Sequence, residues 1–397
     1  MGTVLSFRSI IGRSRMLQFF GFALIALTSA ACRPVRVASS APHSDEITSR
    51  DMDRFQVPGL GLTVLENGRI GPTRTYGVRS RESLEPVTER TVFEACSLSK
   101  PVFAYAVMSL VAEGRLDLDR PLISYVPQGY LEREFFRAEI GDERVRGITA
   151  RMVLSHRTGF PNWRDDAGLS LLFDPGLKFG YSGEGYVLLQ TVVERLTGIP
   201  LQDFARRRVF EPLGMTDSSF VWDDGLEALA ASPHSSSGEV RRHRKRTKAN
   251  AAGSLYTTAP DFARFLLALL DGPGLSDKLR AEMLAKQTPV SPGIDWGLGV
   301  GLETSGGAES IWHWGDNPGF KCFFLVSRQE RRGFVYFSNS DSGLALAWDL
   351  TSRLAGPGHP ILDSTLLAQY KPPELVRARK NPGAQALEPR TPQENVP

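Results

Sequence analysis

Strand-like segments stand at both ends of this chain, with helical segments between them. Residues 59–78, GLGLTVLENGRIGPTRTYGV, alternate apolar and polar side chains around Asn67-Gly68, which predicts a β-hairpin. Near the other end, the runs ESIWHWG, FKCFFLVS and GFVYFSNS are separated by DNPG and RQERRG, which predicts an antiparallel meander. The simplest assembly joins hairpin and meander in one sheet. The predicted fold class is therefore α+β, an antiparallel sheet of N- and C-terminal strands flanked by helices, with an inserted, mostly helical subdomain.

The helical segments are marked by their apolar pattern and their ends. The segment from Leu98 to Glu113 is apolar almost all round, which is typical of a buried helix. Pro101 falls in its first turn, where a missing N–H does no harm. Further helices are predicted at Glu184–Thr197, Pro260–Leu270 and Leu344–Leu354.

The first 32 residues have the composition of a secretory signal. Arginines precede an apolar run from Met16 to Leu27, and the small residues TSAAC follow it. The run is too short for a comfortable transmembrane helix, although an uncleaved anchor is the alternative. Cys32 resembles the lipidated cysteine of bacterial lipoproteins, while Ser29 stands where leucine is usual. We expect a secreted or periplasmic protein, with Cys32 as the candidate lipid tether to the cell envelope.

Composition divides the rest of the chain. Residues 33–45 are polar and Pro/Ser-rich, a predicted tether, and 46–355 form the predicted folded domain. Residues 356–397 are predicted to be a Pro-rich, disordered tail.

A formal net charge of +3 argues against a dedicated nucleic-acid binder. Three cysteines are too few for a disulfide framework, so the core must hold the fold.

Several catalytic motifs are missing from the sequence. It holds no G-x-S-x-G, H-E-x-x-H, C-x-x-C or G-x-x-x-x-G-K-[ST], and its six histidines show no metal-ligand spacing. The sequence therefore implies no metal and no cofactor.

Ser97 and Lys100 head the predicted buried helix. At positions i and i+3 two side chains share one helical face, and the free N–H groups of a helix N-terminus lie beside Ser97. A serine hydroxyl needs a base before it becomes a good nucleophile, and Lys100 could be that base or could depress the pKa of another one. The alternative is a capping serine with a lysine that extends to solvent.

Five stretches decide between these interpretations. The segment SLSKPVFAYAVMSLVAEGRLDLD closely resembles the nucleophile helix of the serine β-lactamase and penicillin-binding protein family. The stretches MVLSHRTGFP, FGYSGEGYVLLQTVVERLTG, AAGSLYTTAPDFARF and HWGDNPGF are similar to further segments of that family, in the same order. The resemblance covers about residues 50–355 and is strongest to the class C β-lactamase and esterase branch.

The resemblance implies an acyl-enzyme mechanism. Ser97 is the implied nucleophile, with Lys100 and Tyr181 as the base system. A nearby Lys100 ammonium is expected to favour the phenolate of Tyr181, which would then take the serine proton.

The resemblance also gives roles to a C-terminal strand. The N–H groups of Ser97 and Asp316 are the implied oxyanion donors. His313 is expected to contact the substrate carboxylate or the Tyr181 oxygen, and Gly315 to let the substrate backbone lie close. The alternative for His313 is a satisfied core or surface histidine.

One departure from the family concerns Gly183, where the family's Y-x-N motif has asparagine. We therefore expect an esterase or amidase on a small-molecule or peptidoglycan-derived substrate, with weak β-lactamase activity open. The alternatives are a D,D-peptidase acting on peptidoglycan, or a non-catalytic envelope protein that keeps the cleft for binding.

The basic run RRHRKRTK, residues 241–248, is either a solvated loop or a segment that attracts acidic substrates.

Overall fold

The computed structural model describes residues 49–137, 140–166, 168–272 and 274–375. The predicted signal at 1–32 and the predicted tether at 33–45 lie outside the described residues, as does the end of the predicted tail, 376–397. Among the helices in the described ranges, none has both the length and the apolar character needed to cross a membrane.

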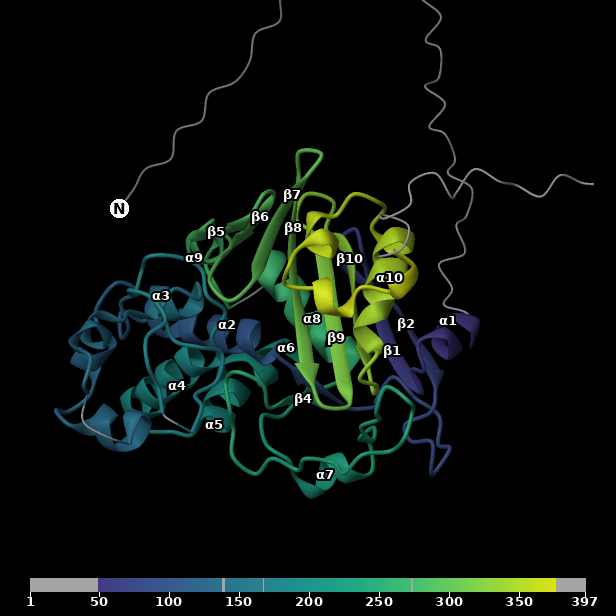
Figure 1. Cartoon of the computed structure of the whole chain (residues 1–397), viewed down its shortest axis with the longest axis horizontal. Coiled ribbons are helices and arrows are strands. Elements are labelled where there is room, and N and C mark those ends of the chain that lie inside the picture. Colours follow the sequence, from purple (N-terminus) through teal and green to yellow (C-terminus); the bar gives the residue numbers. More distant parts are fainter. Residues whose placement is uncertain (1–48, 138–139, 167, 273, 376–397) are drawn as a thin grey trace, which may run out of the picture. The chain divides into compact units, whose positions relative to one another are not determined.

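One eight-stranded antiparallel sheet forms the centre of the fold, in the order β2-β1-β10-β9-β8-β7-β6-β5 (Figure 1). The N-terminal hairpin joins the C-terminal strands because β1 pairs with β10, placing Leu62 opposite Tyr336. Asn67 and Gly68 both have positive φ, 52° and 71°, as a two-residue hairpin turn requires. The predicted fold class is confirmed. The strands are β1 (Gly59–Glu66), β2 (Arg69–Gly77), β5 (Thr288–Ser291), β6 (Ile294–Trp296), β7 (Gly301–Ser305), β8 (Ala308–Asn317), β9 (Phe320–Ser327) and β10 (Arg332–Ser338).

Strands β5, β6 and β7 were not expected from the sequence, nor was a small second sheet of β3 (Phe93–Cys96) and β4 (Leu255–Thr257). All are short, and β5 carries Pro289, which cannot donate to a ladder and is tolerated because β5 is the edge strand. Runs of this length show too little alternation to be recognised.

Both faces of the large sheet are covered, because successive side chains point to opposite sides. On β9, Phe323 and Leu325 join a core with helix α10, whereas Phe324 and Val326 join a core with helices α2 and α8. Figure 1 shows α10 in front of the sheet and α8 behind it. The same core extends from α8 into the helical part, so the inserted helices and the sheet share one apolar interior.

The four predicted helices are present with boundaries within two residues of those expected. Gly198 ends α4 in the left-handed conformation, with φ of 75°. The α-helices are α1 (Ser49–Arg54), α2 (Ser99–Ala112), α3 (Ala150–Leu154), α4 (Gly183–Thr197), α5 (Leu201–Ala205), α6 (Glu211–Leu213), α7 (Asp224–Glu227), α8 (Ala259–Asp271), α9 (Asp277–Met283) and α10 (Leu346–Leu354). Short 3₁₀ or π segments are η1 (Leu122–Tyr125), η2 (Glu132–Phe136), η3 (Glu143–Gly147), η4 (Arg206–Phe210), η5 (Gly343–Ala345), η6 (Pro360–Asp363) and η7 (Ala368–Tyr370).

Residues 356–375 correct the predicted disordered tail. Ile361 in η6 and Leu367 before η7 are completely buried. The Ile361 N–H donates to the buried carboxylate of Glu303 at 3.1 Å, and His359 pairs with the same carboxylate. The proline-rich composition suggested disorder, but a few apolar anchors and one buried carboxylate are enough to fix this segment on the sheet.

The packing of this segment can be tested by removing one anchor. Ile361→Ala is expected to lower the free energy of unfolding by about 2–5 kcal/mol, because it opens a cavity in a filled core. Leu172→Ala, at a side chain that is 67% exposed, is the control and should change it by less than about 0.5 kcal/mol. Urea unfolding followed by circular dichroism measures both. Equal, small effects would mean that residues 356–375 do not belong to the folded unit.

Candidate active site

Ser97 lies in a tight turn between β3 and α2. The residue before it, Cys96, has a φ of 50°, which is strained for a side chain other than glycine. The strain is held because the Cys96 side chain is fully buried and the Ser99 hydroxyl donates to the Cys96 carbonyl at 2.6 Å. The turn leaves Ser97 partly exposed beside the N-terminus of α2, where the helix dipole favours negative charge.

Lys100 is completely buried beneath that serine. Its Nζ lies 3.0 Å from Ser97 Oγ and 2.7 Å from the Ala252 carbonyl oxygen, to which it donates. Removal from water lowers the pKa of Lys100 to about 7, because burial penalises the ammonium form. At neutral pH much of Lys100 is thus an uncharged amine whose lone pair can accept the serine proton.

Tyr181 comes to the same place from the loop before α4. Lys100 Nζ lies 4.9 Å from the centroid of its ring, and its hydroxyl is buried without a hydrogen-bond partner among the described residues. Burial raises the pKa of Tyr181, and the nearby Ser97 hydroxyl offsets only part of that rise. The expected phenolate is therefore not favoured, because burial penalises the charged form of Tyr181 more than the Ser97 hydroxyl stabilises it.

His156 holds the peptide on both sides of Tyr181. Its carbonyl accepts the Gly180 N–H at 2.8 Å, and its Nδ1 accepts the Ser182 N–H at 3.0 Å. Its ring lies 4.2 Å from the Tyr181 ring, centroid to centroid, and its φ is 55°. Sequence reasoning gave His156 no role, because nothing in its spacing connects it with residue 181. In the structure it is the residue that positions the phenol.

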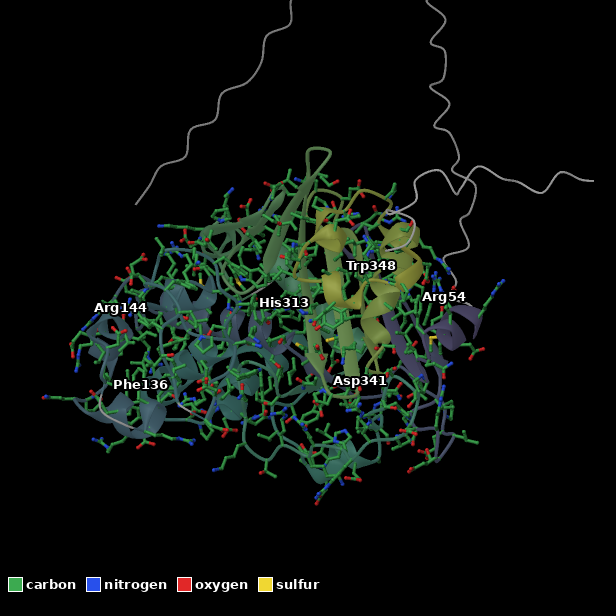
Figure 2. All side chains as sticks on the ribbon, viewed as in Figure 1. Arg54, Phe136, Arg144, His313, Asp341 and Trp348 are labelled. Carbon is green, nitrogen blue, oxygen red and sulfur yellow. The ribbon has the colours of Figure 1, made fainter. Side chains whose placement is uncertain are left out.

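His313, labelled in Figure 2, lies on β8, and its side chain is completely buried. Its Nδ1 bonds the Trp314 carbonyl at 2.7 Å, which places the ring proton there. Burial, reinforced by nearby Lys100, lowers the pKa of His313 to about 3, so the ring is neutral. A buried neutral histidine cannot meet a substrate carboxylate directly. Its ring centroid lies 6.2 Å from that of Tyr181, and a role toward Tyr181 stays a prediction.

Gly315 serves a different purpose from the expected one. A Cβ at this position would lie 2.4 Å from the Cys322 sulfur and 2.8 Å from both the Ala95 carbonyl oxygen and the Cys96 Cβ. The missing side chain therefore lets β8 approach β3, directly before the nucleophile, and does not make room for substrate backbone.

The Asp316 N–H lies at an open edge of β8. Strand β7 pairs with β8 only as far as Gly301 opposite Trp312, so the end of β8 lacks a neighbour on that side. Asn317 and Phe320 flank the two-residue turn to β9, and such a pair exchanges hydrogen bonds. The alternation of an antiparallel ladder then turns the Asp316 N–H away from β9, as an oxyanion donor requires.

The carboxylate of Asp316 anchors this strand end. It forms an ion pair with Lys321 on β9 at 2.8 Å and accepts a hydrogen bond from the hydroxyl of Tyr370 in η7. Lys321 also pairs with Asp341 at 3.1 Å and donates to the Asn317 carbonyl at 3.0 Å. Burial alone would lower the pKa of Lys321, but the two carboxylates hold it above its usual value. The sequence carried no signal for this network, because its members are far apart along the chain.

Gly183 lies under an aromatic side chain. A Cβ at this position would lie 2.7 Å from the Trp163 ring and 3.0 Å from the Asn162 carbonyl oxygen. Asn162 also accepts the Gly183 N–H through its side-chain oxygen at 2.9 Å. Trp163, which is half exposed, therefore fills the space where the family's asparagine side chain would begin.

These groups converge between α2, the loop before α4 and the end of β8. They include a hydroxyl, an uncharged amine, a phenol and a free strand-edge amide, a combination that suits acyl transfer through a serine nucleophile. Across the described ranges, no group of three or more His, Cys, Asp or Glu side chains is arranged to hold a metal ion.

The pKa of Lys100 predicts how Ser97 reactivity depends on pH. Below a pH of about 7 the amine is protonated and cannot accept the serine proton, so the rate of phosphonylation by a fluorophosphonate should rise through that range and then level. Labelling rates from about pH 5 to about pH 9, read by intact mass, test this. Lys100→Arg stays protonated and should be nearly inert throughout. A flat profile in the native protein would remove Lys100 as the base.

The contact over Gly183 predicts a paired effect. Gly183→Asn should lower the free energy of unfolding by about 1–3 kcal/mol, because the new Cβ overlaps the Trp163 ring. Trp163→Ala combined with Gly183→Asn should recover part of that loss. Gly147→Asn, where a Cβ meets nothing within 4 Å, is the control. Urea unfolding compares the four proteins. If Gly183→Asn alone left the free energy of unfolding unchanged, the space over Gly183 would not be filled by Trp163.

Known proteins share this fold and this sequence pattern. The Beta-lactamase family model matches residues 45–354. Esterase EstB from Burkholderia gladioli is 26% identical over 336 residues, which cover 70% of this chain and 81% of EstB. The D-amino acid amidase from Ochrobactrum anthropi, in its crystal structure with L-phenylalanine amide, has a TM-score of 0.57 and 25% identity, covering 73% of this chain and 88% of that one. The penicillin binding protein from Bacillus halodurans has a TM-score of 0.64 and 22% identity, covering 76% and 96%. With most of its length matched in this way, the chain belongs to the beta-lactamase family.

Proposed function

We propose that the protein is a serine hydrolase that opens an ester or small amide through an acyl-enzyme on Ser97. The observation that carries the proposal is the desolvated Lys100 amine, 3.0 Å from Ser97 Oγ, with a pKa of about 7. A lysine buried this deeply is costly, and a protein that only binds a ligand gains nothing from an activated serine.

The reaction follows from the positions of the groups. Ser97 Oγ attacks the carbonyl carbon while its proton passes to Lys100 Nζ. The N–H groups of Ser97 and Asp316 donate hydrogen bonds to the developing oxyanion. The Tyr181 hydroxyl then gives its proton to the leaving group and takes up the proton held by Lys100 Nζ, so that both Tyr181 and Lys100 return to their starting states. A water molecule next attacks the acyl carbon, and the same groups act in reverse to release the acid and restore Ser97.

Two features support esters and small amides over β-lactams. Gly183 and Trp163 replace an amide side chain by an aromatic surface, so the hydrogen bonds that an asparagine would give to a substrate amide are missing. In addition, EstB is named an esterase and the O. anthropi relative a D-amino acid amidase.

Covalent labelling tests the assignment. A fluorophosphonate and a penicillin are each incubated with the protein, and the adduct is located by mass spectrometry. Ser97→Ala should abolish labelling, while Lys100→Ala and Tyr181→Phe should slow it by about 10²-fold or more. Ser155→Ala, at a buried serine outside the candidate active site, is the control and should label normally.

Each outcome separates the candidate activities. Rapid turnover of 4-nitrophenyl esters with no lasting penicillin adduct supports the esterase. A penicillin adduct that is released slowly would favour a D,D-peptidase. Undiminished labelling of Ser97→Ala would overturn the proposal.

A further inference from the structure

A basic cleft of about 780 Å³ is lined by residues that the candidate active site does not use. Five consecutive residues, 241–245, with the sequence Arg-Arg-His-Arg-Lys, form much of its wall, and Glu94, Pro233 and Pro318 complete it. The cleft is therefore made by the run that the sequence alone left either as a solvated loop or as an attractant for acids.

Two arginines of this wall have charges that no ion pair with a described residue neutralises. Arg241 pairs with Asp341 at 2.7 Å and Lys245 pairs with Glu227 at 2.5 Å. Arg242 and Arg244 are exposed and form no ion pair with any residue of the described ranges. A pair of guanidinium groups in a concave wall is a strong binder of carboxylates, because each can donate two parallel hydrogen bonds.

The acidic residue of the cleft does not cancel this charge. Glu94 is only 4% exposed, and its carboxylate accepts the Asn317 side-chain N–H at 2.6 Å. Burial raises the pKa of Glu94, while Asn317 and the more distant Arg246 and Arg244 oppose the rise. Even fully ionised, one carboxylate would balance only one of the two available arginines.

Two residues that line the cleft are close in sequence to the groups of the candidate active site. Glu94 precedes Ser97 by three residues on β3, and Pro318 follows Asp316 by two residues at the β8–β9 turn. Between them, Asn317 donates to Glu94 and also to the Gly253 carbonyl, at 3.1 Å. Occupation of the basic cleft requires that a substrate whose carbonyl lies at Ser97 extend past Asn317.

We infer that this cleft binds a carboxylate carried by the substrate, at Arg242 and Arg244, so that the enzyme prefers acidic esters or amides. The inference rests on the proposed function and gives its substrate class. The test compares two esters of equal chain length, mono-4-nitrophenyl glutarate, which ends in a carboxylate, and 4-nitrophenyl valerate, which ends in a methyl group.

Arg242→Ala with Arg244→Ala should raise the ratio of the glutarate KM to the valerate KM about tenfold, the loss expected for a charge-assisted hydrogen bond at a partly exposed site. Added salt should raise the ratio for the native protein. Arg69→Ala with Arg207→Ala removes the same charge from exposed positions outside the cleft and is the matched control. A ratio that changes equally in both double variants, or in neither, would overturn the inference.

Trp222 offers a second measurement that needs no turnover. Its ring lies 4.5 Å from the His243 ring and 5.3 Å from Lys245 Nζ, so its fluorescence should respond when the cleft is filled. Glutarate titrated into Ser97→Ala should give a saturable change that is lost with Trp222→Phe and weakened about tenfold with Arg242→Ala and Arg244→Ala.

The two measurements separate this inference from the proposed function. Glutarate binding without any ester hydrolysis would support the carboxylate site and contradict the hydrolase. Ester hydrolysis with no fluorescence change and no KM discrimination would support the hydrolase and overturn the site. Inorganic phosphate is titrated in parallel, and binding of phosphate without glutarate would contradict a carboxylate site.

Discussion

The site depends on one desolvated amine. Lys100 enters a helix that is apolar almost all round, and no water remains around Nζ to favour its charge. The same dry surroundings push the pKa of Tyr181 up and that of His313 down to about 3. One cause, exclusion of water, thus removes charge from all three groups. At neutral pH about half of Lys100 is therefore uncharged and able to accept a proton.

The sheet gives this chemistry its geometry. Gly315 allows β8 to lie against the end of β3, so the strand edge and the nucleophile turn are held by backbone contact. Asp316 is then fixed from its side-chain end by Lys321 and Tyr370, while its N–H stays at the open edge. Rigid elements place reacting groups more accurately than loops do. Tyr181, on the loop before α4, is held by His156 on both sides.

The pattern of apolar and polar residues predicted the local and regular parts of the fold. Alternation around Asn67-Gly68 and along β8 to β10 predicted the sheet, and the all-round apolar run predicted α2. The convergence of Ser97, Lys100 and Tyr181 came from motif resemblance, and the geometry agrees with it. The contact of Trp163 with Gly183 could not be predicted, because an isolated tryptophan in a loop has no periodicity. The direction of the Tyr181 pKa was also out of reach, since it depends on how many atoms exclude water, which spacing does not give.

The pairing of β1 with β10 has a consequence for how the chain acquires its structure. During synthesis the hairpin of β1 and β2 emerges early, yet its partner strand follows only after almost the whole domain. Until then the free edge of β1 stays unpaired, although α8, which packs on β1 and β2, is synthesised earlier. Contacts so distant along the chain slow folding, because a very long loop must close first. The edge of the hairpin is therefore covered only after β10 has been synthesised.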